Sequence, residues 1–242
     1  MTEFINPNNV VDTTIFLSRT HFIALAFGTI LIGILYISRN THILKQYGRW
    51  VILITLIMAE LSLNYWYYHT SVWDIKYTLP LQLCSISLYL CCYMIITKQK
   101  FVFEVVYFLG IGGATQALLT PELFYDFPHF RFMQFFIAHI AIIISILYMI
   151  WVEKYRIYFS SIWKAYVSLQ VIALLVFFLN RWSGGNYMFL ANKPLNPSLI
   201  DFLGPYPWYI LSLEVVVLLI FFILYLPFGI KAKKHRKVKE VV

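Results

Sequence analysis

The sequence predicts an all-α polytopic membrane protein, a bundle of seven transmembrane helices with its N-terminus outside and its C-terminus in the cytoplasm. The first observation is composition, because 61% of the 242 residues are hydrophobic and only 12% are charged, whereas soluble domains carry about 25% charged residues. A soluble domain of this size could not bury so much apolar surface, so a water-soluble globule and a disordered chain are both excluded. The second observation is seven apolar runs near the length of about 20 residues that a bilayer crossing needs. The third is an uneven distribution of basic residues.

The apolar runs are long and unbroken, which indicates helices, because a membrane β-barrel needs short segments of alternating polarity. The net charge is +8, but the basic residues are not gathered on one soluble domain, so no nucleic-acid partner is expected. Three cysteines make no disulfide framework. Cys84 and Cys91 are separated by two helical turns, which is too far for a disulfide.

The chain divides into three predicted parts: an extracytoplasmic N-terminal segment (1–19), a transmembrane domain (20–229) and a basic cytoplasmic tail (230–242). The first part lacks a basic start and a small-residue cleavage site, so we expect the first span to be an uncleaved anchor. The predicted spans are approximately 20–38, 49–68, 79–97, 101–119, 133–152, 164–182 and 208–229.

Basic residues set the predicted orientation through the positive-inside rule. Fourteen of the 19 lysines and arginines lie in the first, third and fifth connections and the tail: Arg39, Lys45, Arg49, Lys98, Lys100, Lys154, Arg156, Lys164, Lys231, Lys233, Lys234, Arg236, Lys237 and Lys239. The opposite side holds Arg19, Lys76, Arg131, Arg181 and Lys193. Six spans with one re-entrant segment would put both termini on one side, which this asymmetry disfavours. For the tail we favour a topology signal over a lipid-binding role.

Two long outer connections, 119–132 and 183–207, are rich in proline and aromatic residues. The second is too apolar for a solvated loop, so we expect it to fold over the outer face as a lid or to re-enter the membrane. The run GIGGA (110–114) predicts the close approach of another helix. No internal repeat is evident, which weakens an inverted-repeat transporter interpretation.

Polar side chains inside the spans gather in the predicted outer half of the bilayer. They are Glu60, Asn64, Gln82, Cys84, Gln116, Gln134, His139, Asn180 and Glu214, whereas Glu104 and Gln170 lie deeper. Such residues are costly in a bilayer and face the bundle interior. Hydrogen bonding between helices explains each one singly, but it gives no reason for the group to share one leaflet. We therefore interpret the layer as a cavity that opens outward or to the outer leaflet.

Cys84 and His139 share this depth and are the predicted catalytic residues, as a nucleophile and a general base. Taken alone, each is better explained by packing or by a hydrogen bond between helices. Glu60 or Glu214 would orient the imidazole, and Gln82, Asn64 or Gln116 would stabilise an oxyanion. A zinc site from Cys84, His139 and Glu214 has no supporting ligand spacing. We therefore expect neither a metal nor a cofactor.

Four segments resemble the YwaF-type bacterial integral membrane proteins. They are LPLQLCSISLYL (79–90), GGATQALLTPEL (112–123), FRFMQFFIAHI (130–140) and the NYMFL…LGPYPWY segment (186–209). That family is distantly similar to a eukaryotic transmembrane family described as a cysteine-dependent phospholipid acyltransferase. The resemblance implies a catalytic cysteine that follows a proline and a catalytic histidine on a later span. The histidine corresponds to His139; here Leu81 follows Pro80, Gln82 comes next, and Cys84 lies three residues after Leu81.

The sequence leaves two main functions open. The first is an enzyme of lipid acyl transfer that uses Cys84 and His139 on phospholipid esters. The second is a small-molecule permease or channel in which Glu60, Glu214 and His139 titrate. A sensor or scaffold is the remaining class. The expected setting is the bacterial plasma membrane, with membrane lipids as partners and a phospholipid as the substrate.

Overall fold

A computed structural model describes residues 3–11, 15–194 and 199–240. Its regular structure is entirely helical, with no strand among these residues. The helices are α1 (Arg19–Ser38), α2 (His42–His69), α3 (Leu83–Thr97), α4 (Lys100–Leu119), α5 (Phe130–Trp151), α6 (Phe159–Ser183) and α7 (Trp208–Glu240). Three short 3-10 helices are η1 (Glu3–Ile5), η2 (Tyr187–Phe189) and η3 (Leu199–Leu203). The predicted all-α class is confirmed.

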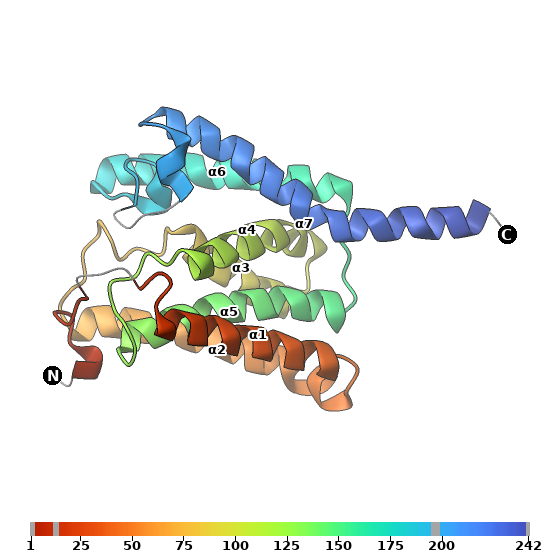
Figure 1. The fold of residues 1–242 in the computed structure, drawn as a ribbon, viewed down its shortest axis with the longest axis horizontal. Helices are drawn as coiled ribbons and strands as arrows, with labels where there is room; N and C mark the ends of the chain where they lie inside the picture. Colours follow the sequence, from red (N-terminus) through yellow and green to blue (C-terminus); the bar gives the residue numbers. More distant parts are fainter. Residues whose placement is uncertain (1–2, 12–14, 195–198, 241–242) are drawn as a thin grey trace.

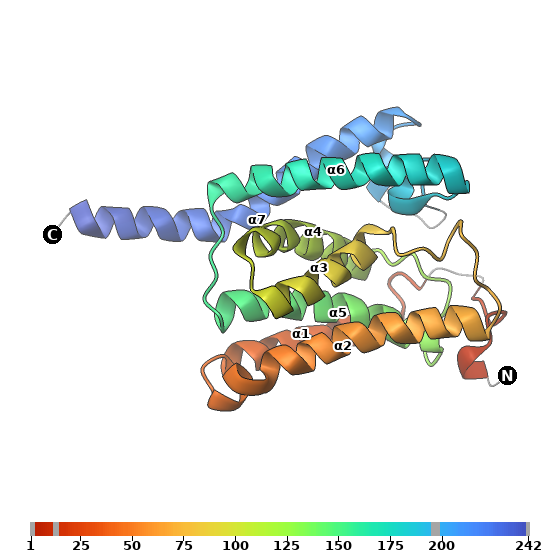
Figure 2. The same cartoon turned by 180° about the vertical axis from the view of Figure 1, so that it is seen from behind.

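The helices form three layers (Figures 1 and 2). Helix α4 lies in the middle and packs against α3, α5 and α6. Helices α1 and α2 cover the side of α5 away from α4, and α6 and α7 form the opposite layer. Helix α7 continues beyond the apolar stretch and projects past the other helices at the end where α3 finishes (Figure 1).

Helix α4 and its neighbour α5 make the core. Val106, Phe103 and Phe108 of α4 and Ile146 of α5 are fully buried. A Cβ atom at Gly110 would lie 2.7 Å from Cδ1 of Ile146, so a larger residue there would require the Ile146 side chain to move. The interpretation of the run 110–114 as a helix-packing element is therefore supported at Gly110.

Large apolar side chains cover the outside of the bundle instead of its interior alone. Ile23, Leu174 and Leu219 are each more than half exposed, which suits a surface solvated by lipid. Six helices, α1, α2, α4, α5, α6 and the first 23 residues of α7, are long and apolar enough to cross a membrane. The chain is therefore built as a multi-pass membrane protein, whereas seven crossings and the orientation of the termini stay predictions.

Helix α3 is the exception to the predicted spans. The sequence predicts a third span from residue 79, but the helix begins at Leu83 and has 15 residues. Its rise is about 22 Å, less than the roughly 30 Å of a hydrocarbon core. The reason is local, because the residue before a proline is held away from helical geometry. Leu79 precedes Pro80 and donates its N–H to the hydroxyl of Tyr187 instead.

The N-terminal segment and the 119–132 connection close one end of the bundle, which we call the N-terminal end. Thr20 donates to the Asp126 carboxylate at 2.6 Å. The indole of Trp66 on α2 donates to the carbonyl of Ile5. His129 precedes α5 and accepts the Arg131 N–H at Nδ1, which satisfies a free amide of the first turn.

A buried ion pair joins α4 to α6 near the opposite end. The Glu104 carboxylate is 2% exposed and accepts hydrogen bonds from Lys164 at 2.5 Å and from Ser161 at 3.0 Å. The sequence analysis places Glu104 deeper than the predicted polar layer. Its contacts show that it holds α4 and α6 together.

Replacing Lys164 with methionine leaves the buried Glu104 carboxylate without its cation. Removing one partner of a fully buried pair costs about 3–5 kcal/mol. Because Lys164 is itself 41% exposed, we expect a smaller cost here, measured as a lower temperature of thermal unfolding in detergent. Adding Glu104→Gln to this variant should recover part of the loss. The matched control is Lys98→Met, whose partner Glu153 is more exposed and whose loss should be smaller. Equal losses for the two lysine variants would contradict the assignment.

Acid should weaken the N-terminal end through His129. Burial lowers the pKa of His129 from its usual 6.5, and Arg131 lowers it further, against the opposing hydrogen bond to the Asn6 carbonyl. The folded state therefore binds fewer protons than the unfolded state just below pH 6.5, so stability falls as pH drops through this value and levels off below the folded pKa. His129→Asn, which keeps a helix cap but does not titrate, should flatten this part of the melting-temperature profile. An unchanged profile would show that other groups govern it.

Candidate functional site

Cys84 is the second residue of α3, because this helix starts at Leu83. The first hydrogen bond of the helix runs from the Ile86 N–H to the Gln82 carbonyl at 3.1 Å, and Gln82 makes no side-chain cap. The amides of Leu83, Cys84 and Ser85 have no acceptor in the described part of the chain. Free amides at a helix N-terminus attract negative charge, so hydrogen-bond donors surround the Cys84 backbone.

Gly113 of α4 leaves space beside the Cys84 thiol. A Cβ atom built at Gly113 would lie 4.0 Å from Sγ of Cys84 and 3.4 Å from Cδ2 of Leu83. The adjacent Gly112 faces the other way, toward Ile220 of α7 at 3.6 Å. Helix α4 therefore presents a side without side-chain atoms to the cysteine.

The imidazole of His139 is held in one tautomer. The side chain is buried, and its Nδ1 lies 2.7 Å from the carbonyl oxygen of Phe135 one turn earlier on α5. A carbonyl only accepts hydrogen bonds, so Nδ1 carries the proton and Nε2 of the neutral ring carries a lone pair. The backbone thereby performs the orienting role that the sequence analysis gives to a carboxylate.

Helix packing places Cys84 and His139 toward the same end of the bundle. Gly110 of α4 faces Ile142 and Ile146 of α5. Gly113, beside Cys84, is three residues further along α4, and His139 is three residues before Ile142 and seven before Ile146. Both steps run toward the N-terminal end, by about 4.5 Å on α4 and by roughly 4.5 to 10.5 Å on α5. Within the described residues no hydrogen bond joins the thiol to the imidazole.

Ser87 adds an unsatisfied polar atom near Cys84. It follows Cys84 by three residues and so lies on the same side of α3. Its side chain is 1% exposed, and its hydroxyl has no hydrogen-bond partner among the described residues. Buried hydroxyls without a partner are rare, so this atom is free to make a further polar contact.

Glu60 does not orient His139 through a direct hydrogen bond. Its carboxylate is buried and accepts from the side chain of Asn64 at 3.3 Å and from the hydroxyl of Tyr89 at 3.0 Å. Asn64 also donates to the Glu60 carbonyl, so its side-chain amide makes hydrogen bonds within α2. The three residues form a polar contact between α2 and α3.

The remaining predicted amides bind protein groups. Gln82 accepts the Met188 N–H at 2.9 Å, which leaves its side-chain N–H groups beside the start of α3. Gln116 donates to Thr120 one turn later on α4. Gln134 bonds Arg131 and the Ala59 carbonyl.

The 183–207 segment is fixed to the bundle through η2. Asn180 exchanges two hydrogen bonds of 2.9 Å with the backbone of Tyr187. The Tyr187 hydroxyl donates to the Ile75 carbonyl at 2.6 Å, and burial raises its pKa. These contacts join α6 to the connection that leads into α3, so the part of the segment around η2 packs over the Cys84 level. Residues 195–198 of this segment lie outside the described residues.

Glu214 lies apart from the other predicted site residues. Its carboxylate accepts a hydrogen bond from Gln170 at 2.6 Å between α7 and α6. The sequence analysis puts Gln170 deeper than Glu214, whereas the structure pairs them. No three acidic, histidine or cysteine side chains among the described residues are grouped so that they could hold a metal ion.

The helices, their lengths and their apolar surface define a multi-pass helical membrane protein with a polar interior at the N-terminal end. The model of the TMEM164 family matches residues 16–225, and the chain belongs to this family. An uncharacterized protein of Treponema pallidum (strain Nichols) is 27% identical over 154 residues. The match covers 62% of this chain and 62% of the relative. No solved structure matches the chain.

Sequence reasoning misses three features of the site: the free amides of α3, the Phe135 carbonyl and the unpartnered hydroxyl of Ser87. The free amides depend on the residue at which α3 begins, and Pro80 is the sequence feature that could have indicated this start. The second follows from the four-residue spacing of Phe135 and His139 on one helix, but it is a backbone contact that side-chain types do not reveal.

The space at Gly113 predicts a test by thiol labelling. Gly113→Val places methyl groups against Leu83 and Cys84 and should slow the reaction of a small uncharged maleimide with Cys84 severalfold. The measurement uses folded protein in which Cys91 and Cys92 are serine. Gly112→Val, which faces α7, is the matched control and should label like its parent. Equal labelling rates for both valine variants would place the accessible side of Cys84 elsewhere.

Proposed function

We propose that the protein is a membrane-embedded acyltransferase that uses Cys84 and His139 on a phospholipid ester. The observation that carries the proposal is the position of Cys84 in the uncapped first turn of α3, beside Gly113; the proposal pairs it with His139 of α5, toward the same end of the bundle. A nucleophile, a base with a fixed tautomer and free amide donors are the parts that acyl transfer requires. The protein would work in the bacterial plasma membrane with its N-terminal end outward.

In the proposed reaction the Cys84 thiol gives its proton to Nε2 of His139, and Sγ attacks the ester carbonyl. The free amides of α3 and the remaining N–H of Gln82 stabilise the oxyanion. The ester C–O bond breaks, and the leaving alcohol takes the proton from His139. A hydroxyl of an acceptor lipid then attacks the thioester and passes its proton to His139. The C–S bond breaks and the thiol regains that proton.

The permease or channel alternative needs Glu60, His139 and Glu214 to act along one path. Glu60 is bonded between α2 and α3, and Glu214 is bonded between α6 and α7. This separation weighs against the alternative and favours the enzyme, whose essential residues lie on α3 and α5.

Acyl-enzyme trapping tests the proposal. The purified full-length chain in detergent is incubated with phospholipid carrying a labelled acyl chain, and intact-protein mass spectrometry follows the mass of one acyl group. We expect hydroxylamine-sensitive label on Cys84. Cys84→Ser should abolish the thioester, and His139→Gln should lower its rate of formation by about a hundredfold or more.

Cys92→Ser is the matched control for this experiment, since Cys92 is on the same helix and only half-buried but lies outside the proposed machinery. It should form the acyl-enzyme at the parental rate. Parental acylation in the Cys84→Ser variant, or parental lipid turnover in cells that carry Cys84→Ala, would refute the proposed role of Cys84.

A further inference from the structure

A cavity with polar residues in its lining lies at the end of α6, beside η2. It has a volume of about 320 Å³, within the range of small-molecule sites. Its walls are the last turns of α6, the turn that follows and the segment after η2; they include Phe177, Arg181, Gly184, Leu190, Asn192 and Tyr206. No residue of the Cys84 site lines it.

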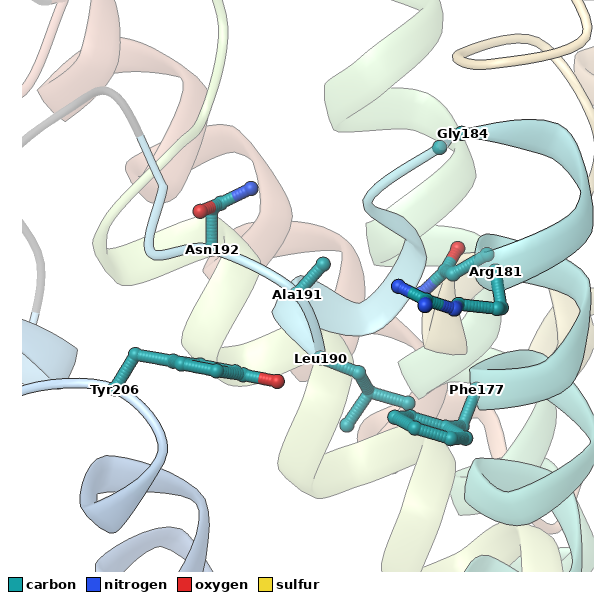
Figure 3. Close-up of a pocket in the computed structure, with 9 residues that line it drawn as sticks. Phe177, Arg181, Gly184, Leu190, Ala191, Asn192 and Tyr206 are labelled. Atoms are coloured by element: carbon teal, nitrogen blue, oxygen red, sulfur yellow. The ribbon is translucent and has the colours of Figure 1, made fainter.

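Three polar residues of this cavity present donors to its open side. Within the described residues, the guanidinium of Arg181, the hydroxyl of Tyr206 and the side-chain amide of Asn192 have neither a hydrogen bond nor an ion pair, and all three residues are exposed. Asn180, which also lines the cavity, is bonded to the backbone of Tyr187. Figure 3 shows the guanidinium reaching from α6 toward Ala191, while the Tyr206 hydroxyl points inward from the opposite wall. The cavity therefore presents convergent donors from two elements.

The charge around the cavity is positive. No aspartate or glutamate lines it. Lys76 approaches from the connection before α3, because a Cβ at Gly184 would lie 3.6 Å from its Cε. Of the five basic residues that the sequence analysis assigns to this side of the membrane, Arg181 lines the cavity and Lys76 lies beside the lining residue Gly184.

Arg131 and Lys193 at the same end have partners, whereas Arg181 lines the cavity without one among the described residues. Arg131 donates to Gln134 and lies over the rings of Trp66 and Tyr67. Lys193 donates to the Asp201 carbonyl at 3.3 Å. Arg181 lies in the last turn of α6, where the helix dipole favours a cation. The dipole does not account for the donors on the facing wall.

We propose that this cavity binds a phosphate ester through Arg181, with Tyr206 and Asn192 as further donors. A planar guanidinium binds phosphate through two parallel hydrogen bonds, and Phe177 and Leu190 supply an apolar wall for the carbon skeleton of the ester. The ligand class is a glycerophosphate, either as the headgroup region of a membrane phospholipid or as a free molecule. The inference does not depend on the chemistry proposed for Cys84.

Lipid retention tests the site without any turnover. The full-length chain in detergent is offered dioleoyl-phosphatidylglycerol or dioleoylglycerol, and native mass spectrometry counts the bound lipid. We expect preferential retention of the phosphate-bearing lipid. Arg181→Gln removes a charge-assisted contact worth about 1.5–3 kcal/mol, so apparent affinity should fall roughly tenfold or more. Arg181→Lys should keep part of the affinity.

Arg19→Gln is the matched control, because it makes the same charge change at the N-terminal end but outside the cavity. It should retain lipid like the parent. Tyr206→Phe is a second variant, and it should weaken retention severalfold without changing charge. Equal retention by Arg181→Gln and Arg19→Gln, or equal retention of dioleoylglycerol, would overturn the proposal.

Competition by sn-glycerol 3-phosphate distinguishes the two sources of the ligand. Displacement of the lipid at millimolar concentration, lost in Arg181→Gln, would identify a free glycerophosphate as a ligand. Retention that resists this competitor but still depends on Arg181 would identify the lipid headgroup. Both results support phosphate recognition, and because the readout is binding, failure of acylation at Cys84 has no bearing on it.

Discussion

Helix α4 approaches α5 so closely that a Cβ atom at Gly110 would lie 2.7 Å from Ile146, and the rest of the bundle is arranged around this contact. The contact fixes the relative height of two helices, and with it the level at which Gly113 and His139 lie. Because α3 also packs along α4, the same contact sets the height of Cys84. Interiors of this kind are close-packed and transmit displacement. We therefore expect a larger residue at Gly110 to shift Cys84 and His139, the proposed nucleophile and base, relative to each other, although it touches neither.

The start of α3 is the second constraint, and it comes from outside the helix. Pro80 prevents Leu79 from continuing a helix, and the Leu79 N–H is taken by Tyr187. Tyr187 is in turn fixed to Asn180 of α6. The free amides beside Cys84 thus exist because an element from the far side of α4 reaches across the N-terminal end. This dependence explains how a short helix can place backbone donors inside an apolar bundle without the backbone being exposed to lipid.

The sequence predicts the fold class well, because long apolar runs with few charges have one physical solution in a bilayer. It also predicts six of the helices to within a few residues at most boundaries. The shared depth of Cys84 and His139, which follows from the rise per residue, stays a prediction. It cannot predict which helices are neighbours, so it groups Glu214 with Glu60 although the structure bonds the first to Gln170 and the second to Tyr89. It also begins the third span too early, since the contact of Leu79 with Tyr187 spans more than a hundred residues.

Hydrogen-bond satisfaction separates polar residues that hold helices together from those that remain for a ligand. In a membrane interior an unpaired polar group cannot form hydrogen bonds with water, so natural helix bundles pair nearly all of their buried polar groups. Glu104 with Lys164, Glu60 with Tyr89 and Glu214 with Gln170 are paired in this way, and each joins two helices. Inside the bundle, the donors left over among the described residues are the amides of α3 and the hydroxyl of Ser87. These groups, and not the paired carboxylates, are therefore the ones from which a ligand site in the bundle has to be argued.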